Sequence, residues 1–139
     1  MRVTQSIKEL RQICQYSRDK DYGKRPWPER NLQRPISIYF TWLFLEIGLS
    51  ANQVSFISFI ITVIAGAFLI LPGPGYWFIG IALLLLYEPL TCADGEIARY
   101  NKTASPKGAF WNSMPEQFAW AYTPICISFG LYSMFHNIY

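Results

Sequence analysis

The sequence predicts an all-α integral membrane protein, in which an N-terminal amphipathic, interfacial helix is followed by about three transmembrane helices. Apolar residues make up 52% of the 139 residues, a high fraction for a small soluble domain. The charges are segregated, because nine of the 12 Lys and Arg lie in residues 1–34 and none lies between Arg34 and Arg99. That cation-free stretch can hold two helices of about 20 residues, the length that crosses a bilayer core.

Residues 1–34 form a basic segment that we expect to stay in the cytoplasm, without a signal peptide. Within it, residues 4–17 can form a short helix with apolar residues on one side, a pattern suited to an anionic membrane surface. A solvated cationic head that only orients the protein explains the same residues equally well. Residues 19–33 contain Gly23 and two prolines and are typical of a linker.

The membrane domain, residues 35–139, begins with an apolar segment at 36–47. This segment is too short to span a bilayer, so we expect it to lie in the interface plane. Gly48 should end it, and Ser50-x-x-Gln53 is a capping-box pattern at the start of the next helix. The first span is therefore predicted at about 51–72.

The second and third spans are predicted at about 76–99 and 107–135. An uncharged turn at 72–75 separates the first two spans, and a basic loop at 99–107 separates the last two. The positive-inside rule then places the N-terminus and this basic loop in the cytoplasm of a multi-pass cell-membrane protein. Pro115 and Pro124 should kink the third helix.

The acidic residues in these spans indicate a functional site, since ionisable groups are costly inside a membrane. Helical spacing places two sets of residues on one face each: Thr91, Asp94, Gly95 and Ala98 on the second span, and Gly108, Asn112 and Glu116 on the third. The short connection predicts that the two helices are antiparallel neighbours whose faces meet. Facing carboxylates in a dry site need a cation between them, and oxygen ligands of this kind suit Mg²⁺ or Mn²⁺.

These residues resemble the signature of the CDP-alcohol phosphatidyltransferases, Asp-x-x-Asp-Gly-x-x-Ala-Arg, eight residues, then Gly-x-x-x-Asp-x-x-x-Asp. The chain reads Thr91-Cys-Ala-Asp94-Gly95-Glu-Ile-Ala98-Arg99, eight residues, then Gly108-Ala-Phe-Trp-Asn112-Ser-Met-Pro-Glu116. Every spacing is kept, and the identical positions are Asp94, Gly95, Ala98, Arg99 and Gly108. The entry into the first span at 50–54 is also similar to that of the family.

The resemblance implies a membrane fold of which this chain covers about the first three of six spans. It implies an enzyme of phospholipid synthesis that transfers a substituted phosphate from a CDP-linked donor, such as CDP-diacylglycerol, to an alcohol and releases CMP. The implied partners are the lipid bilayer, a CDP-linked lipid or alcohol donor and, as for members of the family, a second copy of the chain, and no nucleic acid is expected.

The resemblance also assigns roles residue by residue. The implied metal ligands, for Mg²⁺ or Mn²⁺, are Asp94, Glu116, Asn112 and Thr91. The implied nucleotide- and phosphate-binding residues are Gly95, Ala98, Arg99 and Gly108. Glu116 is also the implied catalytic base, which would activate the acceptor hydroxyl.

Three of the four acidic positions depart from the signature, because Thr91, Asn112 and Glu116 stand where aspartates are expected. Two carboxylates balance about one divalent ion where four balance two. A displacement of about 1 Å can cost about 100-fold in rate, so the longer Glu116 side chain also matters. The alternative to an active transferase is therefore an impaired or inactive relative that keeps the fold and binds nucleotide or lipid. A membrane-anchored interaction protein without a nucleotide site would explain neither the spacing nor the glycines.

The remaining polar residues of the second span have alternative interpretations. Glu88 either supplies a missing carboxylate to the site or pairs with a polar partner in the bundle. Arg99 either contacts donor phosphates or extends to the membrane surface. Glu96 points away from the predicted site face, and we expect it to be solvated. The three cysteines have no paired or metal-type spacing and are interpreted as small apolar fillers.

Overall fold

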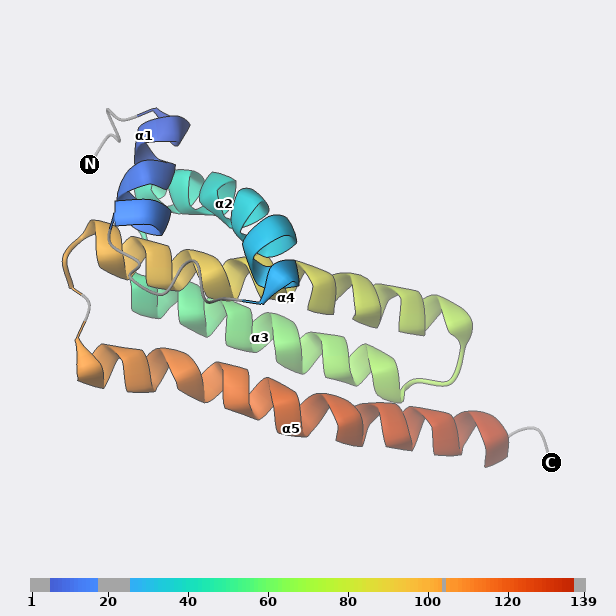
Figure 1. The fold of residues 1–139 in the computed structure, drawn as a ribbon. Helices are drawn as coiled ribbons and strands as arrows, with labels where there is room; N and C mark the ends of the chain where they lie inside the picture. The colour runs from blue at the N-terminus through green and yellow to red at the C-terminus, as the bar shows by residue number, and fades with distance from the viewer. Residues whose placement is uncertain (1–5, 18–25, 104, 137–139) are drawn as a thin grey trace.

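The computed structural model describes residues 6–17, 26–103 and 105–136, and every regular element in these ranges is a helix (Figure 1). The side chains of residues 17, 107, 109, 111 and 112 lie outside the described set. The chain begins with α1 (Ile7–Arg11) and continues directly into the π-helical turn η1 (Gln12–Ser17). A second π-helical turn, η3 (Glu29–Gln33), leads into α2 (Arg34–Ile47), so the end of the predicted linker is helical.

The three long helices have the predicted order and nearly the predicted bounds. They are α3 (Ala51–Ile70), α4 (Pro74–Tyr100) and α5 (Pro106–His136). Gly48 ends α2 in the left-handed conformation, at φ +84°, which costs glycine no steric energy. The Ser50–Gln53 capping box is present, with the Ser50 N–H donating to Gln53 Oε1 at 2.9 Å. Pro115 and Pro124 lie inside α5.

α3 is the central helix of the bundle, with α4 on one side and α5 on the other (Figure 1). α5 therefore packs mainly against α3 and makes few contacts with α4. The predicted contact between the second and third spans is therefore present but small, because small residues on α3 let α5 pack closely against α3. At Gly66, an added Cβ would collide with the Tyr122 ring, and at Gly130 it would collide with the Leu69 carbonyl oxygen.

Within the described residues, two helices are long and apolar enough to cross a membrane, Ala51–Ile70 and Pro74–Tyr100. Only 39% and 28% of their most apolar windows are buried inside the protein. α5 is long enough to span as well, but its first turns carry polar residues. It is not one of the two helices that are both long and apolar enough. The first two predicted spans thus have suitable helices, and the third stays a prediction.

The elements α1, η1, η3 and α2 form a compact N-terminal layer that covers the C-terminal half of α4 (Figure 1). Its core joins Leu10 and Cys14 to Ile38 of α2, Val54 of α3 and Ile97 of α4, and all five are fully buried. The apolar side of residues 7–17 therefore faces the protein. Neither sequence interpretation of this segment, as a membrane-surface helix or as a solvated head, anticipated that packing.

Candidate functional site

A pocket of about 580 Å³ lies between the N-terminal layer and the ends of α4 and α5 nearest the 101–105 connection. Its α4 wall includes Tyr87, Glu88, Thr91, Cys92, Gly95 and Arg99, and its α5 wall includes Glu116 and Trp120. The third wall is formed by Pro26, Pro28, Glu29, Gln33 and Arg34. The pocket thus combines four of the eight signature positions with a segment that the sequence had indicated only as a linker.

The four signature residues on the pocket wall are Thr91, Gly95, Arg99 and Glu116. The others are placed elsewhere or are not described. Ala98 packs against the core of the N-terminal layer, and the Gly108 N–H donates to Ser105 Oγ at 3.0 Å, at the start of α5. The side chain of Asn112, a predicted metal ligand, lies outside the described residues.

Asp94 is turned toward α3. Its side chain is only 4% exposed, and its Oδ2 accepts a hydrogen bond of 2.6 Å from Ser55 Oγ. The physical reason is the helix order, because α3 is the neighbour that the Asp94 face of α4 meets. Asp94 is therefore not part of the pocket lining, although it interacts electrostatically with Glu116.

The two carboxylates of the implied metal-ligand set, Asp94 and Glu116, have different surroundings. Among the described residues, no group of three or more His, Cys, Asp or Glu side chains is placed to hold a metal ion. Asp94, the one unchanged aspartate of the signature, is bonded to Ser55, whereas Mg²⁺ and Mn²⁺ sites need several convergent oxygen ligands.

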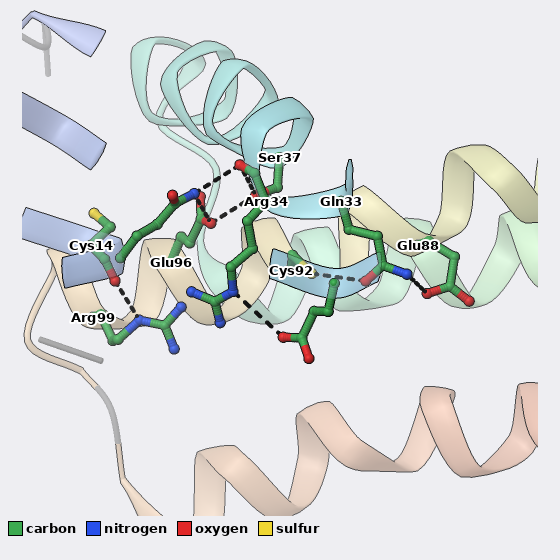
Figure 2. Close-up of polar contacts among 10 residues, drawn as sticks. Cys14, Gln33, Arg34, Ser37, Glu88, Cys92, Glu96 and Arg99 are labelled. Atoms are coloured by element: carbon green, nitrogen blue, oxygen red, sulfur yellow. Dashed lines mark hydrogen bonds and ion pairs between the residues drawn. The ribbon is translucent and has the colours of Figure 1, made fainter. Parts of the chain in front are cut away.

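Glu88 has a polar partner in the N-terminal layer (Figure 2). Gln33 Nε2 donates to Glu88 Oε2 at 2.7 Å, and the Cys92 thiol donates to Gln33 Oε1 at 3.8 Å. This contact agrees with the interpretation of Glu88 as a paired carboxylate, and Glu88 also lines the pocket, as its interpretation as a site carboxylate requires. Cys92 is thus a pocket-lining residue, whereas Cys14 and Cys126 are the buried fillers that the sequence predicted.

Glu96 is fully buried, so the expectation of a solvated flank is wrong. It does point away from the pocket, but α2 and η1 cover that side of α4. Its Oε1 accepts hydrogen bonds of 2.7 Å from Gln15 Nε2 and from Ser37 Oγ, and its Oε2 accepts one of 2.7 Å from Thr41 Oγ1. One carboxylate therefore ties three helical elements together.

Arg99 links the same layer to the pocket (Figure 2). Its Nε donates to the Cys14 carbonyl oxygen at 2.9 Å, and its guanidinium lies over Gly95. A Cβ added at Gly95 would lie 3.3 Å from Arg99 Nη1, so the glycine gives the guanidinium room. Arg99 is therefore held on the pocket wall, and it does not extend freely toward solvent.

No known protein family, curated protein or solved structure matches this chain. The likeness to the CDP-alcohol phosphatidyltransferases consequently rests on the signature residues and their spacing.

The Glu96 contacts generate a test of how the N-terminal layer is held. Glu96→Ala removes the acceptor that joins Gln15, Ser37 and Thr41 to α4. The Arg34 carbonyl oxygen still accepts from Gln15 and Ser37, whereas the buried Thr41 hydroxyl loses this acceptor at a cost of about 1–3 kcal/mol. We expect η1 to detach from α4 and trypsin to cleave faster after Arg11, as followed by mass spectrometry. Glu96→Gln is the matched control, since its amide oxygen still accepts and its NH₂ can donate to Thr41. Equal cleavage rates in the wild type and the alanine variant would contradict this role.

Proposed function

We propose that this chain is a multi-pass membrane protein with a CDP-alcohol phosphatidyltransferase-like pocket, which binds a CDP-linked lipid or alcohol donor but is impaired in phosphate transfer. One observation carries the proposal: Arg99, Gly95 and Glu116 line a single pocket, while the Asp94 carboxylate is bonded to Ser55 outside it. Gly95 and Arg99, two of the implied phosphate-binding residues, thus share the pocket with Thr91 and Glu116, whereas Asp94 is directed toward α3.

The exposed apolar surface supports a membrane location. Phe56, Phe78 and Leu85 on α3 and α4 are 62%, 75% and 70% exposed. On a soluble monomer such patches are rarely extensive, because each exposed apolar Å² costs about 25 cal/mol in water. Lipid chains would cover this surface, and the exposed Phe129 and Tyr132 of α5 favour a third span.

We place α2 in the interface plane and the N-terminal layer on the cytoplasmic side. The inner face of α2 is buried against α4, while Ile36, Tyr39 and Ile47 are exposed. A helix with a protein-facing side and an apolar outer side suits the boundary between headgroups and acyl chains. In this orientation the pocket lies at the cytoplasmic end of the spans.

The size of the pocket and the Arg99 donor support binding of a nucleoside diphosphate. Its volume of about 580 Å³ falls within the usual range of small-molecule sites, about 300–1,000 Å³. The Arg99 guanidinium presents a planar set of N–H donors, and charge-assisted hydrogen bonds to phosphate are roughly twice as strong as neutral ones. Gly95 keeps that guanidinium close to the helix.

An active phosphotransferase is the second candidate, and the placement of Glu116 favours it. The Glu116 side chain is exposed on the same pocket wall as Thr91 and Arg99, where a carboxylate could accept a proton from an acceptor hydroxyl. CMP release measures transfer activity, and the CDP dissociation constant measures binding, so the two measurements together distinguish the two candidates.

Isothermal titration of the full chain in detergent micelles should detect CDP binding in EDTA, with a Kd that Mn²⁺ changes by less than about threefold. Arg99→Gln should weaken binding by about tenfold or more, the loss of about 1.5–3 kcal/mol from a charge-assisted contact. Lys102→Gln removes the same charge from the exposed loop and should leave the Kd unchanged. CMP release from CDP-diacylglycerol with an alcohol should stay at background.

An absence of CDP binding would overturn the proposed function. CMP release above background that disappears in Glu116→Gln would establish the active transferase in its place.

The orientation is tested by cysteine labelling in intact cells, in a background from which the three native cysteines have been removed. Gly75→Cys in the uncharged turn should react with a membrane-impermeant maleimide, and Lys102→Cys should react only after permeabilisation. Position 75 suits the test because an added Cβ there meets nothing within 4 Å. Labelling of position 102 from outside would reverse the assignment.

A further inference from the structure

Arg34 is a pocket residue that the signature does not contain. Its side chain is only 2% exposed, yet it lines the pocket opposite α4. A guanidinium stays protonated in proteins, so its burial is costly unless an opposite charge or several acceptors compensate it. A guanidinium on the wall of a cavity can also donate hydrogen bonds to an anion that occupies the cavity.

The backbone of Arg34 is held firmly. Its carbonyl oxygen accepts hydrogen bonds from Gln15 Nε2 at 2.8 Å and from Ser37 Oγ at 3.1 Å. The same two donors also bond to Glu96 (Figure 2). The start of the Arg34 side chain is therefore fixed to α4 through Glu96, and its guanidinium extends from that anchor toward Glu29.

The contact between the Arg34 side chain and Glu29 is longer than a typical charge-assisted hydrogen bond. Arg34 Nε and Glu29 Oε1 are 3.5 Å apart, whereas charge-assisted N–H···O bonds are typically about 2.7–2.9 Å. The Glu29 side chain is 20% exposed and lies on η3, one helical turn before Arg34. A phosphate oxygen could therefore approach the guanidinium more closely than Glu29 Oε1 approaches Arg34 Nε.

We propose that Arg34 is a second anion-binding residue of this pocket and that Glu29 competes with the ligand for its guanidinium. The ligand class is a phosphate or diphosphate group, which would contact Arg34 from the N-terminal layer and Arg99 from α4. This inference rests on the proposed function, because it names a further residue of the same binding site. Glu29 then lowers the apparent affinity by the free energy needed to displace it.

If the Arg34–Glu29 ion pair is purely structural, Glu29→Gln should change the ligand affinity in the opposite direction. If Glu29 only stabilises Arg34, removal of either charge damages the pocket and weakens binding. If Glu29 competes with the ligand, Glu29→Gln removes the competitor and tightens binding, while Arg34→Gln weakens it. Arg30 is the neighbour of Glu29 on η3 and is not among the described residues of the pocket wall, so Arg30→Gln controls for the net charge of the segment.

The experiment is isothermal titration of the full chain in detergent micelles with two probes, CDP and inorganic pyrophosphate. Glu29→Gln should lower both dissociation constants by about threefold to tenfold, and Arg34→Gln should raise both by about tenfold or more. Arg34→Lys should lie between Arg34→Gln and the wild type, because it keeps the charge but loses the planar donor set. Arg30→Gln should match the wild type. Thermal unfolding of each variant identifies any that fail to fold, and Glu29→Gln decides the question if Arg34→Gln is one of them.

The outcomes separate this inference from the proposed function. Binding of CDP that depends on Arg99 but is unchanged or weakened in Glu29→Gln overturns the role of Arg34 and Glu29 and leaves the proposed function standing. Pyrophosphate binding with the predicted opposite effects, but no CDP binding, supports Arg34 as an anion ligand and overturns the nucleotide site. If neither probe binds the wild type, both proposals are wrong.

Discussion

The buried carboxylate of Glu96 is the interaction on which the rest of this structure depends. A polar group without partners is costly to bury, and Glu96, at 0% exposure, is offered hydrogen bonds by Gln15 of η1 and by Ser37 and Thr41 of α2. The Glu96 carboxylate has all three partners only when η1 and α2 are both docked on α4. The carboxylate therefore specifies where the N-terminal layer sits, and the apolar contacts of Leu10, Ile38 and Ile97 add stabilisation without that directional requirement.

The pocket follows from this docking. Because Gln15 also donates to the Arg34 carbonyl oxygen, the contact that holds η1 against Glu96 fixes the start of α2, and with it the pocket wall that carries Glu29, Gln33 and Arg34. Arg99 closes the arrangement from α4 by donating to the Cys14 carbonyl oxygen. A segment distant in sequence from the signature thus supplies about a third of the lining of the site.

The elements whose ends carry local signals could be predicted from the sequence. Gly48, the Ser50–Gln53 capping box and the Pro72–Gly75 turn act on their immediate neighbours, and the helices begin and end beside them. The orientations of Asp94 and Glu96 could not be predicted, because a helical wheel gives a direction about the helix axis and not the neighbour found there. With α3 between α4 and α5, Asp94 meets Ser55, and with α2 docked on α4, Glu96 is buried.

The most direct test of this account is a double-mutant cycle in which the CDP dissociation constant is measured for wild type, Gln15→Ala, Glu96→Ala and the double variant. Neither residue lines the pocket, so a local view of binding predicts no effect. If the Glu96 contacts position the pocket wall, each single variant weakens binding by about tenfold, and the double variant is no weaker than Glu96→Ala because both changes break the same link. A wild-type dissociation constant in Glu96→Ala, with η1 released, would contradict the account.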